Sequence, residues 1–124
     1  MNNGCYFFNS GKRIDFKIPY YINFIASNKD AYGLCLFDYC TENKIEKIVF
    51  TAYVSEAVNA IIEFYSFNSK NSVYINLKQG VHKYVLLNPD SNKDTLKKVI
   101  LYIPYINNMT LEETKIVIES FFLK

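Results

Sequence analysis

Tyrosine is the residue type in this sequence that is best suited to a binding site. The chain has eleven tyrosines and ten phenylalanines but no tryptophan among its 124 residues. Because a domain of this size cannot bury eleven phenol rings and give every hydroxyl a partner, several tyrosines must reach the surface. An exposed ring can stack on the apolar face of a ligand, while neighbouring carboxylates, amides or ammonium groups bond its hydroxyls. The chain therefore offers the side chains of a non-covalent binding face.

No spacing in the sequence is typical of a catalytic or zinc site. The cysteines Cys5, Cys35 and Cys40 form no CxxC pair, and His82 is the only histidine. We expect buried thiols, or a bridge between Cys35 and Cys40 if the protein is secreted. His82 has no neighbouring nucleophile motif, which favours a hydrogen-bonded strand residue over a general base. We therefore expect no enzyme activity.

Composition also restricts the partners. The net charge is +2, positive and negative side chains are interspersed, and Arg13 is the only arginine, a pattern that argues against nucleic-acid binding. No apolar run approaches the roughly 20 residues of a membrane-spanning helix. The first residues lack the basic and apolar regions of a secretory signal. We expect that the protein stays inside the cell or that the chain is one domain cut from a longer protein.

Short β-rich runs separated by polar turns dominate the sequence. RIDFKI alternates cleanly between apolar and polar residues, and NSKNS is a plain turn. The runs that we expect to form strands are residues 13–18, 20–26, 32–39, 45–54, 73–77, 81–87, 97–105 and 115–123. Their loops are short enough for antiparallel pairing. The pattern predicts one all-β domain over residues 1–124, a two-sheet antiparallel β-sandwich of jelly-roll type.

One segment, FTAYVSEAVNAIIEFYSFNS at residues 50–69, fits two structures. Its apolar residues follow the stripe of an amphipathic helix that Ser55 could cap: Ala57, Ala60, Ile61, Phe64 and Tyr65. A helix near residues 55–67 would make the fold α+β. The flanking strands instead favour a hairpin with its turn at SEAVN, because a hairpin continues the antiparallel order. In that hairpin Tyr53 and Tyr65 share one face of a sheet.

Strand alternation separates a core from a surface. The positions expected to point inward are Ile48, Phe50, Ala52, Val54, Ala60, Ile62, Phe64, Val73, Ile75, Leu77, Val99, Leu101 and Ile103. The opposite positions include six that could bind a ligand: Tyr53, Glu63, Tyr65, Tyr74, Asn76 and Tyr102. We expect the tyrosines to stack and Glu63 and Asn76 to bond hydroxyls. The same face carries Val49, Ile61 and Ile100, so it suits a partner protein, or cross-strand tyrosine pairs without a ligand, equally well.

The order of strands resembles that of carbohydrate-binding modules of the galactose-binding-like, jelly-roll type. The resemblance covers about three-quarters of the chain and is carried by YGLCLFDY, IEKIVFTAYVS, AIIEFYS, GVHKYVLLN, LKKVILYIPY and TKIVIESFFL. It implies a non-catalytic domain that recognises a glycan or polysaccharide, with no cofactor, as an accessory to a larger carbohydrate-active protein. The alternative for the same fold is a structural or protein-interaction domain without a sugar ligand.

Many modules of this type hold a structural calcium ion. In this sequence Asp15, Asp38 and Glu119 could supply its oxygen ligands. Solvated carboxylates at strand edges are the other interpretation of these three residues.

Overall fold

The computed structural model describes residues 6–9, 12–15, 20–25, 32–38, 44–91, 94–103 and 113–124. Side chains are described for residues 33–38, 44–91, 94–103 and 115–124. Within these residues every element is a β-strand, and none is a helix long and apolar enough to cross a membrane. The prediction of an all-β chain is therefore confirmed.

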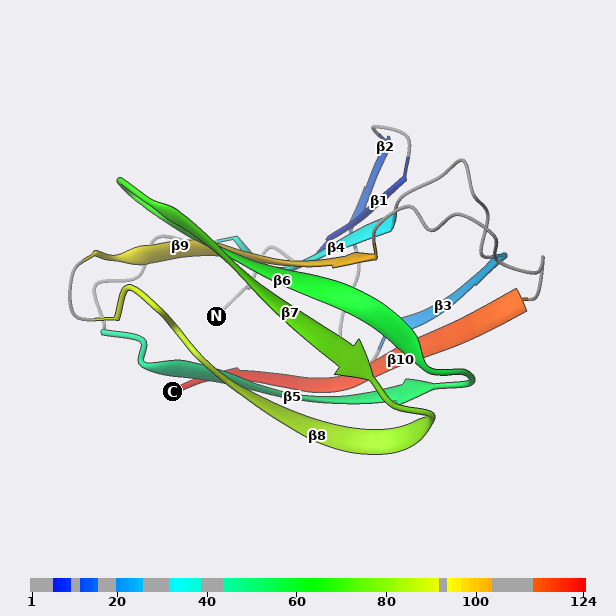
Figure 1. Cartoon of the computed structure of the whole chain (residues 1–124). Coiled ribbons are helices and arrows are strands. Elements are labelled where there is room, and N and C mark those ends of the chain that lie inside the picture. Colours follow the sequence, from blue (N-terminus) through cyan, green and yellow to red (C-terminus); the bar gives the residue numbers. More distant parts are fainter. Residues whose placement is uncertain are drawn as a thin grey trace.

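The strands form two antiparallel sheets, which lie as an upper and a lower layer in Figure 1. The six-stranded sheet has the order β2 (Lys12–Asp15), β1 (Tyr6–Asn9), β4 (Tyr32–Asp38), β9 (Leu96–Ile103), β6 (Val58–Ser66) and β7 (Lys70–Leu77). The four-stranded sheet has the order β3 (Tyr20–Ile25), β10 (Glu113–Leu123), β5 (Lys47–Val54) and β8 (Gly80–Leu87). This is the predicted two-sheet β-sandwich. The short strand β1 was not among the expected runs.

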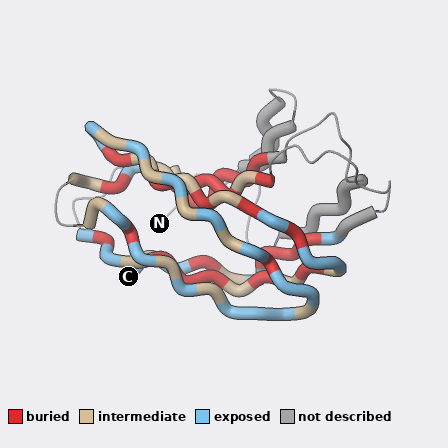
Figure 2. The backbone as a smooth tube through the Cα atoms, viewed as in Figure 1, coloured by how far each residue is buried: buried red, intermediate tan, exposed pale blue. Residues whose placement is uncertain are grey.

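The core lies between the two sheets, where the buried segments of both layers meet in Figure 2. Phe37, Phe50 and Phe64 are fully buried there and come from β4, β5 and β6. All thirteen positions predicted to point inward belong to this core or pack against it, with Val73 and Ile75 half-buried on the edge strand β7. Each fully buried large apolar side chain contributes about 1.5 to 3 kcal/mol, so this layer dominates stability.

The segment at residues 50–69 holds the end of β5 and the whole of β6 and no helix, but the predicted hairpin between them is wrong. Strand β5 is an inner strand that pairs with β10 on one side and β8 on the other. Because both edges of β5 are occupied, β6 cannot pair with it and crosses to the other sheet. Ser55 begins this crossing with two bonds to Lys115 of β10: its N–H donates to the Lys115 carbonyl at 2.9 Å, and its Oγ accepts from the Lys115 N–H at 2.8 Å.

A polar cluster joins the β8–β9 connection to the β6–β7 turn. The Asp94 carboxylate accepts from the Asn68 N–H at 2.7 Å and from the Ser69 hydroxyl at 3.3 Å. Asp90 accepts from the same hydroxyl at 2.8 Å and also bonds the Asn71 amide. Buried Asn88 donates to the Ile45 carbonyl at 2.9 Å, which ties the exit of β8 to the approach to β5. Asn88, Asp90 and Asp94 therefore close this end of the sandwich.

Candidate functional site

Five of the six predicted site residues lie on the outer surface of the six-stranded sheet. We call this surface the tyrosine face and define it by Asn59, Ile61, Glu63, Tyr65, Lys70, Ser72, Tyr74, Asn76, Lys98 and Tyr102. Strands β9, β6 and β7 lie side by side beneath it. Since side chains alternate along each strand, the positions next to these residues point into the core, which holds the face in place.

One row across the face combines two tyrosines with an aliphatic side chain. Tyr102 of β9 pairs with Ile61 of β6, which pairs with Tyr74 of β7. Tyr74 is 79% exposed, whereas Tyr102 and Ile61 are half-buried. Neighbouring strands lie about 4.8 Å apart, so the two tyrosines stand roughly 10 Å from each other at the backbone. The row is therefore an apolar strip with an exposed ring at the sheet edge.

An open hollow lies beside this row. It has a volume of about 390 Å³ and is lined by Asn59, Ala60, Ile61, Tyr74 and Ile75. Its size falls near the lower end of the roughly 300 to 1,000 Å³ that small-molecule sites occupy. An aromatic ring, an aliphatic side chain and an amide thus meet around one concave surface.

One of the residues that line the hollow, Asn59, forms an amide pair with Asn76. The Asn76 Nδ2 donates to the Asn59 Oδ1 at 3.0 Å across the β6–β7 ladder. Both residues are exposed. Each amide group has two donors and an acceptor with two lone pairs, so this single bond leaves capacity on both residues for ligand hydroxyls.

The other end of the face is charged. Lys70 Nζ lies 2.7 Å from Glu63 Oε2, and the Tyr65 hydroxyl donates to the same oxygen at 3.3 Å. The hydrogen bond and the charge of Glu63 raise the pKa of Lys70. Lys70 and Lys98 also lie over the Tyr65 ring, 5.3 and 5.5 Å from its centroid, within the range of cation–π attraction. Tyr65 and Glu63 therefore already interact within the protein and are less available for a ligand than Tyr74.

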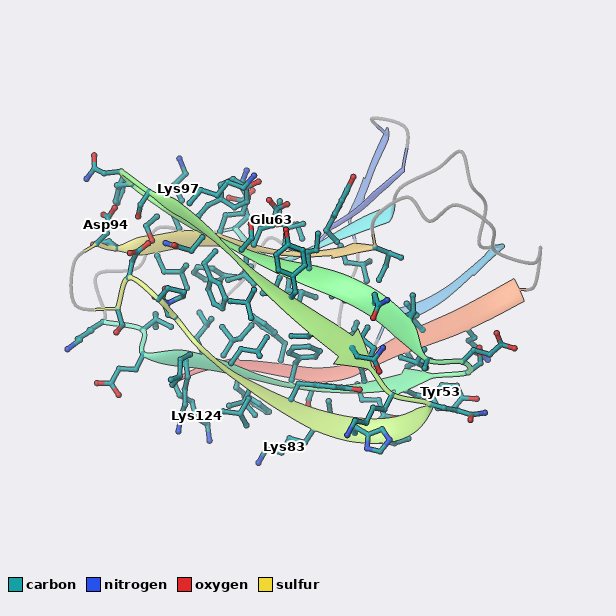
Figure 3. All side chains as sticks on the ribbon, viewed as in Figure 1. Tyr53, Glu63, Lys83, Asp94, Lys97 and Lys124 are labelled. Atoms are coloured by element: carbon teal, nitrogen blue, oxygen red, sulfur yellow. The ribbon has the colours of Figure 1, made fainter. Side chains whose placement is uncertain are left out.

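Tyr53 does not join the other predicted site residues. It belongs to β5 of the four-stranded sheet, where it pairs with Val81 and Val117. Figure 3 shows Tyr53 on the lower layer and Glu63 on the upper layer. The expectation that Tyr53 and Tyr65 share a face is wrong, because it rested on a hairpin that the structure replaces with a crossing between sheets. The face therefore keeps Glu63, Tyr65, Tyr74, Asn76 and Tyr102.

The predictions for the histidine and the cysteines have different outcomes. His82 is exposed and its Nε2 lies 2.8 Å from the Gln79 carbonyl, as expected for a hydrogen-bonded strand histidine. Cys35 is buried and its Sγ lies 3.4 Å from the Phe37 carbonyl. Cys5 and Cys40 lie outside the described residues, so the bridge to Cys35 stays a prediction.

The calcium prediction draws on both sheets. Asp38 lies in β4 and Glu119 in β10, and the side chain of Asp15 lies outside those that are described. Among the described side chains no group of three or more His, Cys, Asp and Glu is placed to hold a metal. A calcium site at these residues stays a prediction.

Sequence reasoning did not single out Asn59, Lys70 or Lys98 as members of the face. Each reaches its place through strand register: Asn59 opposite Asn76, Lys70 opposite Tyr65, and Lys98 on the other side of Tyr65. The available signal was the short turn NSKNS, which fixes how β7 folds back on β6. Lys98 had no comparable local signal, because β9 follows β6 only after two strands of intervening chain.

Comparison with known proteins finds similar structures at low identity. The chain matches no protein-family model and no curated protein sequence. It is similar to the family 11 carbohydrate-binding module of the cellulosomal cellulase Lic26A-Cel5E of Clostridium thermocellum, with 11% identity, coverage of 99% of this chain and 88% of that chain, and a TM-score of 0.45. A second structure of a family 11 module from Clostridium thermocellum, in complex with a β-1,3-1,4-mixed-linked tetrasaccharide, has 10% identity, coverage of 97% and 88%, and a TM-score of 0.44.

The likeness spans nearly the whole chain and concerns the arrangement of its strands. The fold of the chain is an all-β, two-sheet sandwich, and the properties of its surface follow from the chain's own residues.

Proposed function

We propose that this domain binds carbohydrate without catalysis, through the part of the tyrosine face formed by Tyr74, Ile61, Tyr102, Asn59 and Asn76. It would act as an accessory of a larger carbohydrate-active protein or as a polysaccharide-recognition unit. The observation that carries the proposal is the open hollow, which is lined by the exposed Tyr74 and by Asn59, whose amide bonds that of Asn76. Apolar and hydroxyl-bonding groups alternate there over a few ångströms, as they do on a sugar.

The chemistry of a pyranose supports this choice of residues. Its axial C–H groups form an apolar face that can stack on the Tyr74 ring, and its equatorial hydroxyls both donate and accept. Amide side chains offer both functions, which an ammonium or a carboxylate alone cannot do. The face is also open and lies along the strands, so a ligand could continue past the hollow as a chain of sugars. We therefore expect an oligosaccharide to bind more tightly than a single sugar.

A glycan array followed by isothermal titration calorimetry tests the proposal. We expect binding to at least one plant, microbial or host polysaccharide. Tyr74→Ala should weaken it about tenfold, which corresponds to about 1.4 kcal/mol. Asn76→Ala should weaken it as well, because the sugar hydroxyls lose one amide. Both residues are exposed, so circular dichroism should show that the variants remain folded.

The matched control is Tyr53→Ala, which removes a tyrosine from the opposite sheet. It should bind the same glycan with unchanged affinity. Loss of binding in Tyr53→Ala together with normal binding in Tyr74→Ala would move the site to the four-stranded sheet. An array without binding to any class of glycan would contradict carbohydrate recognition altogether.

A further inference from the structure

The outer surface of the four-stranded sheet carries most of the exposed apolar side chains that the structure describes. Six large apolar side chains are exposed among the residues whose side chains are described, and four of them, Val81, Val85, Leu87 and Phe122, lie on this one surface at 52 to 73% exposure. We call it the valine face and define it by Lys47, Val49, Thr51, Tyr53, Val81, Lys83, Val85, Leu87, Val117, Phe122 and Lys124. It lies on the opposite side of the sandwich from the tyrosine face.

The apolar residues of the valine face are contiguous. Phe122 of β10 pairs with Val49 of β5, which pairs with Val85 of β8. Val117, Tyr53 and Val81 form a second row across the same three strands. From Val81 to Leu87 the face extends about 20 Å along β8, at about 3.4 Å per residue. Val49 and Val117 are only 6% exposed, so the accessible apolar area comes from Val81, Val85, Leu87 and Phe122. An exposed apolar patch of this kind on a folded domain is typical of an interaction site.

The charges on this face are mostly positive. Lys83 stands between Val81 and Val85, and Lys47 and Lys124 flank the end that carries Leu87. Figure 3 shows Lys83 and Lys124 projecting away from the sandwich on this side. Glu119, at the bulge of β10, is the one carboxylate residue among the described side chains of these three strands. The electrostatic complement of the valine face is therefore acidic.

The valine face ends at an edge of the four-stranded sheet where a further strand can pair. Strand β8 ends the order of the four-stranded sheet, and its outward residues alternate as Val81, Lys83, Val85 and Leu87. An extended chain can add to such an edge through backbone hydrogen bonds, with its side chains opposite those of the edge strand. Two copies of β8 that pair with Lys83 opposite Lys83 would bring like charges together, which opposes that pairing of the chain with itself.

We propose that the valine face docks an acidic, extended segment of another polypeptide, which adds to the edge of β8. Its outward residues would be apolar opposite Val81 and Val85 and acidic opposite Lys83. Burial of apolar surface against Val85, Leu87 and Phe122 gives the affinity. The carboxylate opposite Lys83 makes binding specific for acidic segments. This interaction is independent of sugar binding, because the two faces belong to different sheets.

A synthetic peptide in which valine alternates with polar residues, with one central glutamate among the valines, serves as the probe. Titration into the ¹⁵N-labelled chain, followed by NMR, should shift the amide signals of β8 and β5 and leave those of β7 unchanged. A second peptide with lysine in place of glutamate should bind at least tenfold more weakly. Lys83→Glu should reverse this preference, and Lys97→Glu, an exposed lysine on the other sheet, should not.

Several results would overturn the proposal. One is equal binding of the two peptides, or no binding of either. Another is a shift map centred on β7. Sedimentation that shows a dimer, which Val85→Lys dissolves, would make a second copy of the chain the occupant. Binding to phosphatidylserine vesicles without binding to the acidic peptide would make a lipid surface the occupant.

Discussion

Lys70 and Glu63 form an ion pair across the β6–β7 ladder, with 2.7 Å between Lys70 Nζ and Glu63 Oε2. Lys70 is more exposed than Glu63, at 53% against 15% of the side chain. The pair organises the charged end of the tyrosine face, because the same carboxylate oxygen also accepts from the Tyr65 hydroxyl. Its effect on stability is expected to be small, since water and salt screen an exposed pair.

The ion pair should hold the pKa of Lys70 above its ordinary value. Glu63 raises this pKa above its ordinary value of 10.5, so the pair stabilises the folded state fully below pH 10.5 and the stabilisation is lost as the pH rises through the folded pKa. Glu63→Gln should therefore lower the Lys70 pKa toward 10.5, as measured by NMR titration of the side chain. The melting temperature at pH 7 should change little. An unchanged Lys70 pKa in Glu63→Gln, with Glu46→Gln as the control, would contradict the interaction.

Asp94 should make stability depend on acid pH. The Asn68 N–H, followed by the Thr95 N–H and the Ser69 hydroxyl, bonds its carboxylate and holds its pKa below 3.8, although partial burial opposes the shift. The stabilisation is present above pH 3.8 and is lost as the pH falls through the folded pKa. Asp94→Asn should therefore melt at a lower temperature than the wild type at pH 7.

A thermal unfolding series monitored by circular dichroism from pH 7 to pH 2 checks this. The gap between wild type and Asp94→Asn should narrow as the pH falls below 3.8. Exposed Glu119→Gln, on the other sheet, serves as the control. A gap that stays constant down to pH 2 would show that Asp94 acts through packing and not through its charge.

Ser66 is a buried hydroxyl that should reduce stability. It is only 6% exposed, and its Oγ has no hydrogen-bond partner within the described part of the chain. Because an unsatisfied buried polar group costs about 1 to 3 kcal/mol, Ser66→Ala should raise the free energy of unfolding by about 1 kcal/mol. The matched variant Ser69→Ala, whose hydroxyl bonds both Asp90 and Asp94, should lower it by about the same amount. Urea denaturation measures both, and destabilisation by Ser66→Ala would mean that the hydroxyl is satisfied in solution.

Gly80 is needed for the turn between the two edge strands β7 and β8. Its φ is +94°, a conformation that residues with a side chain rarely adopt. A Cβ at this position would meet His82 Nε2 at an ordinary distance of 3.6 Å, so the penalty is conformational and not steric crowding. Gly80→Ala should lower the free energy of unfolding by about 1 to 2 kcal/mol. Gly80→Asn should cost less, because asparagine tolerates positive φ better. Equal losses in chemical denaturation would contradict this explanation.

Local alternation was sufficient to predict most strands and the core. The inward residues of β5, β6 and β9 were assigned correctly because side chains of a strand alternate between two faces whatever the strand pairs with. For the same reason Glu63 and Tyr65, and likewise Tyr74 and Asn76, were placed correctly as pairs on one surface. Strand β1 was missed because YFFN is short and does not alternate.

Pairing partners could not be predicted in the same way. The hairpin at SEAVN failed because β5 is enclosed by β10 and β8, and β10 lies some sixty residues further along the chain. Tyr53 is therefore not part of the site, because the pairing of β5 with β10 is a long-range contact that has no local signature in the sequence. Asn59 and Lys98 were not predicted as members of the face, because their neighbours depend on the register of β6 with β7 and β9, which local sequence does not reveal.

The crossing between β5 and β6 also bears on how the chain reaches its fold. Among the described ladders, only β1 with β2 and β6 with β7 join consecutive strands, and the others join strands that are distant in sequence. Chains dominated by such contacts fold in milliseconds to seconds, because long loops must close before the contacts form. We expect the β6–β7 hairpin to form early. Strand β5 gains its second neighbour only when β10, at the end of the described chain, docks between it and β3, so the four-stranded sheet is completed late.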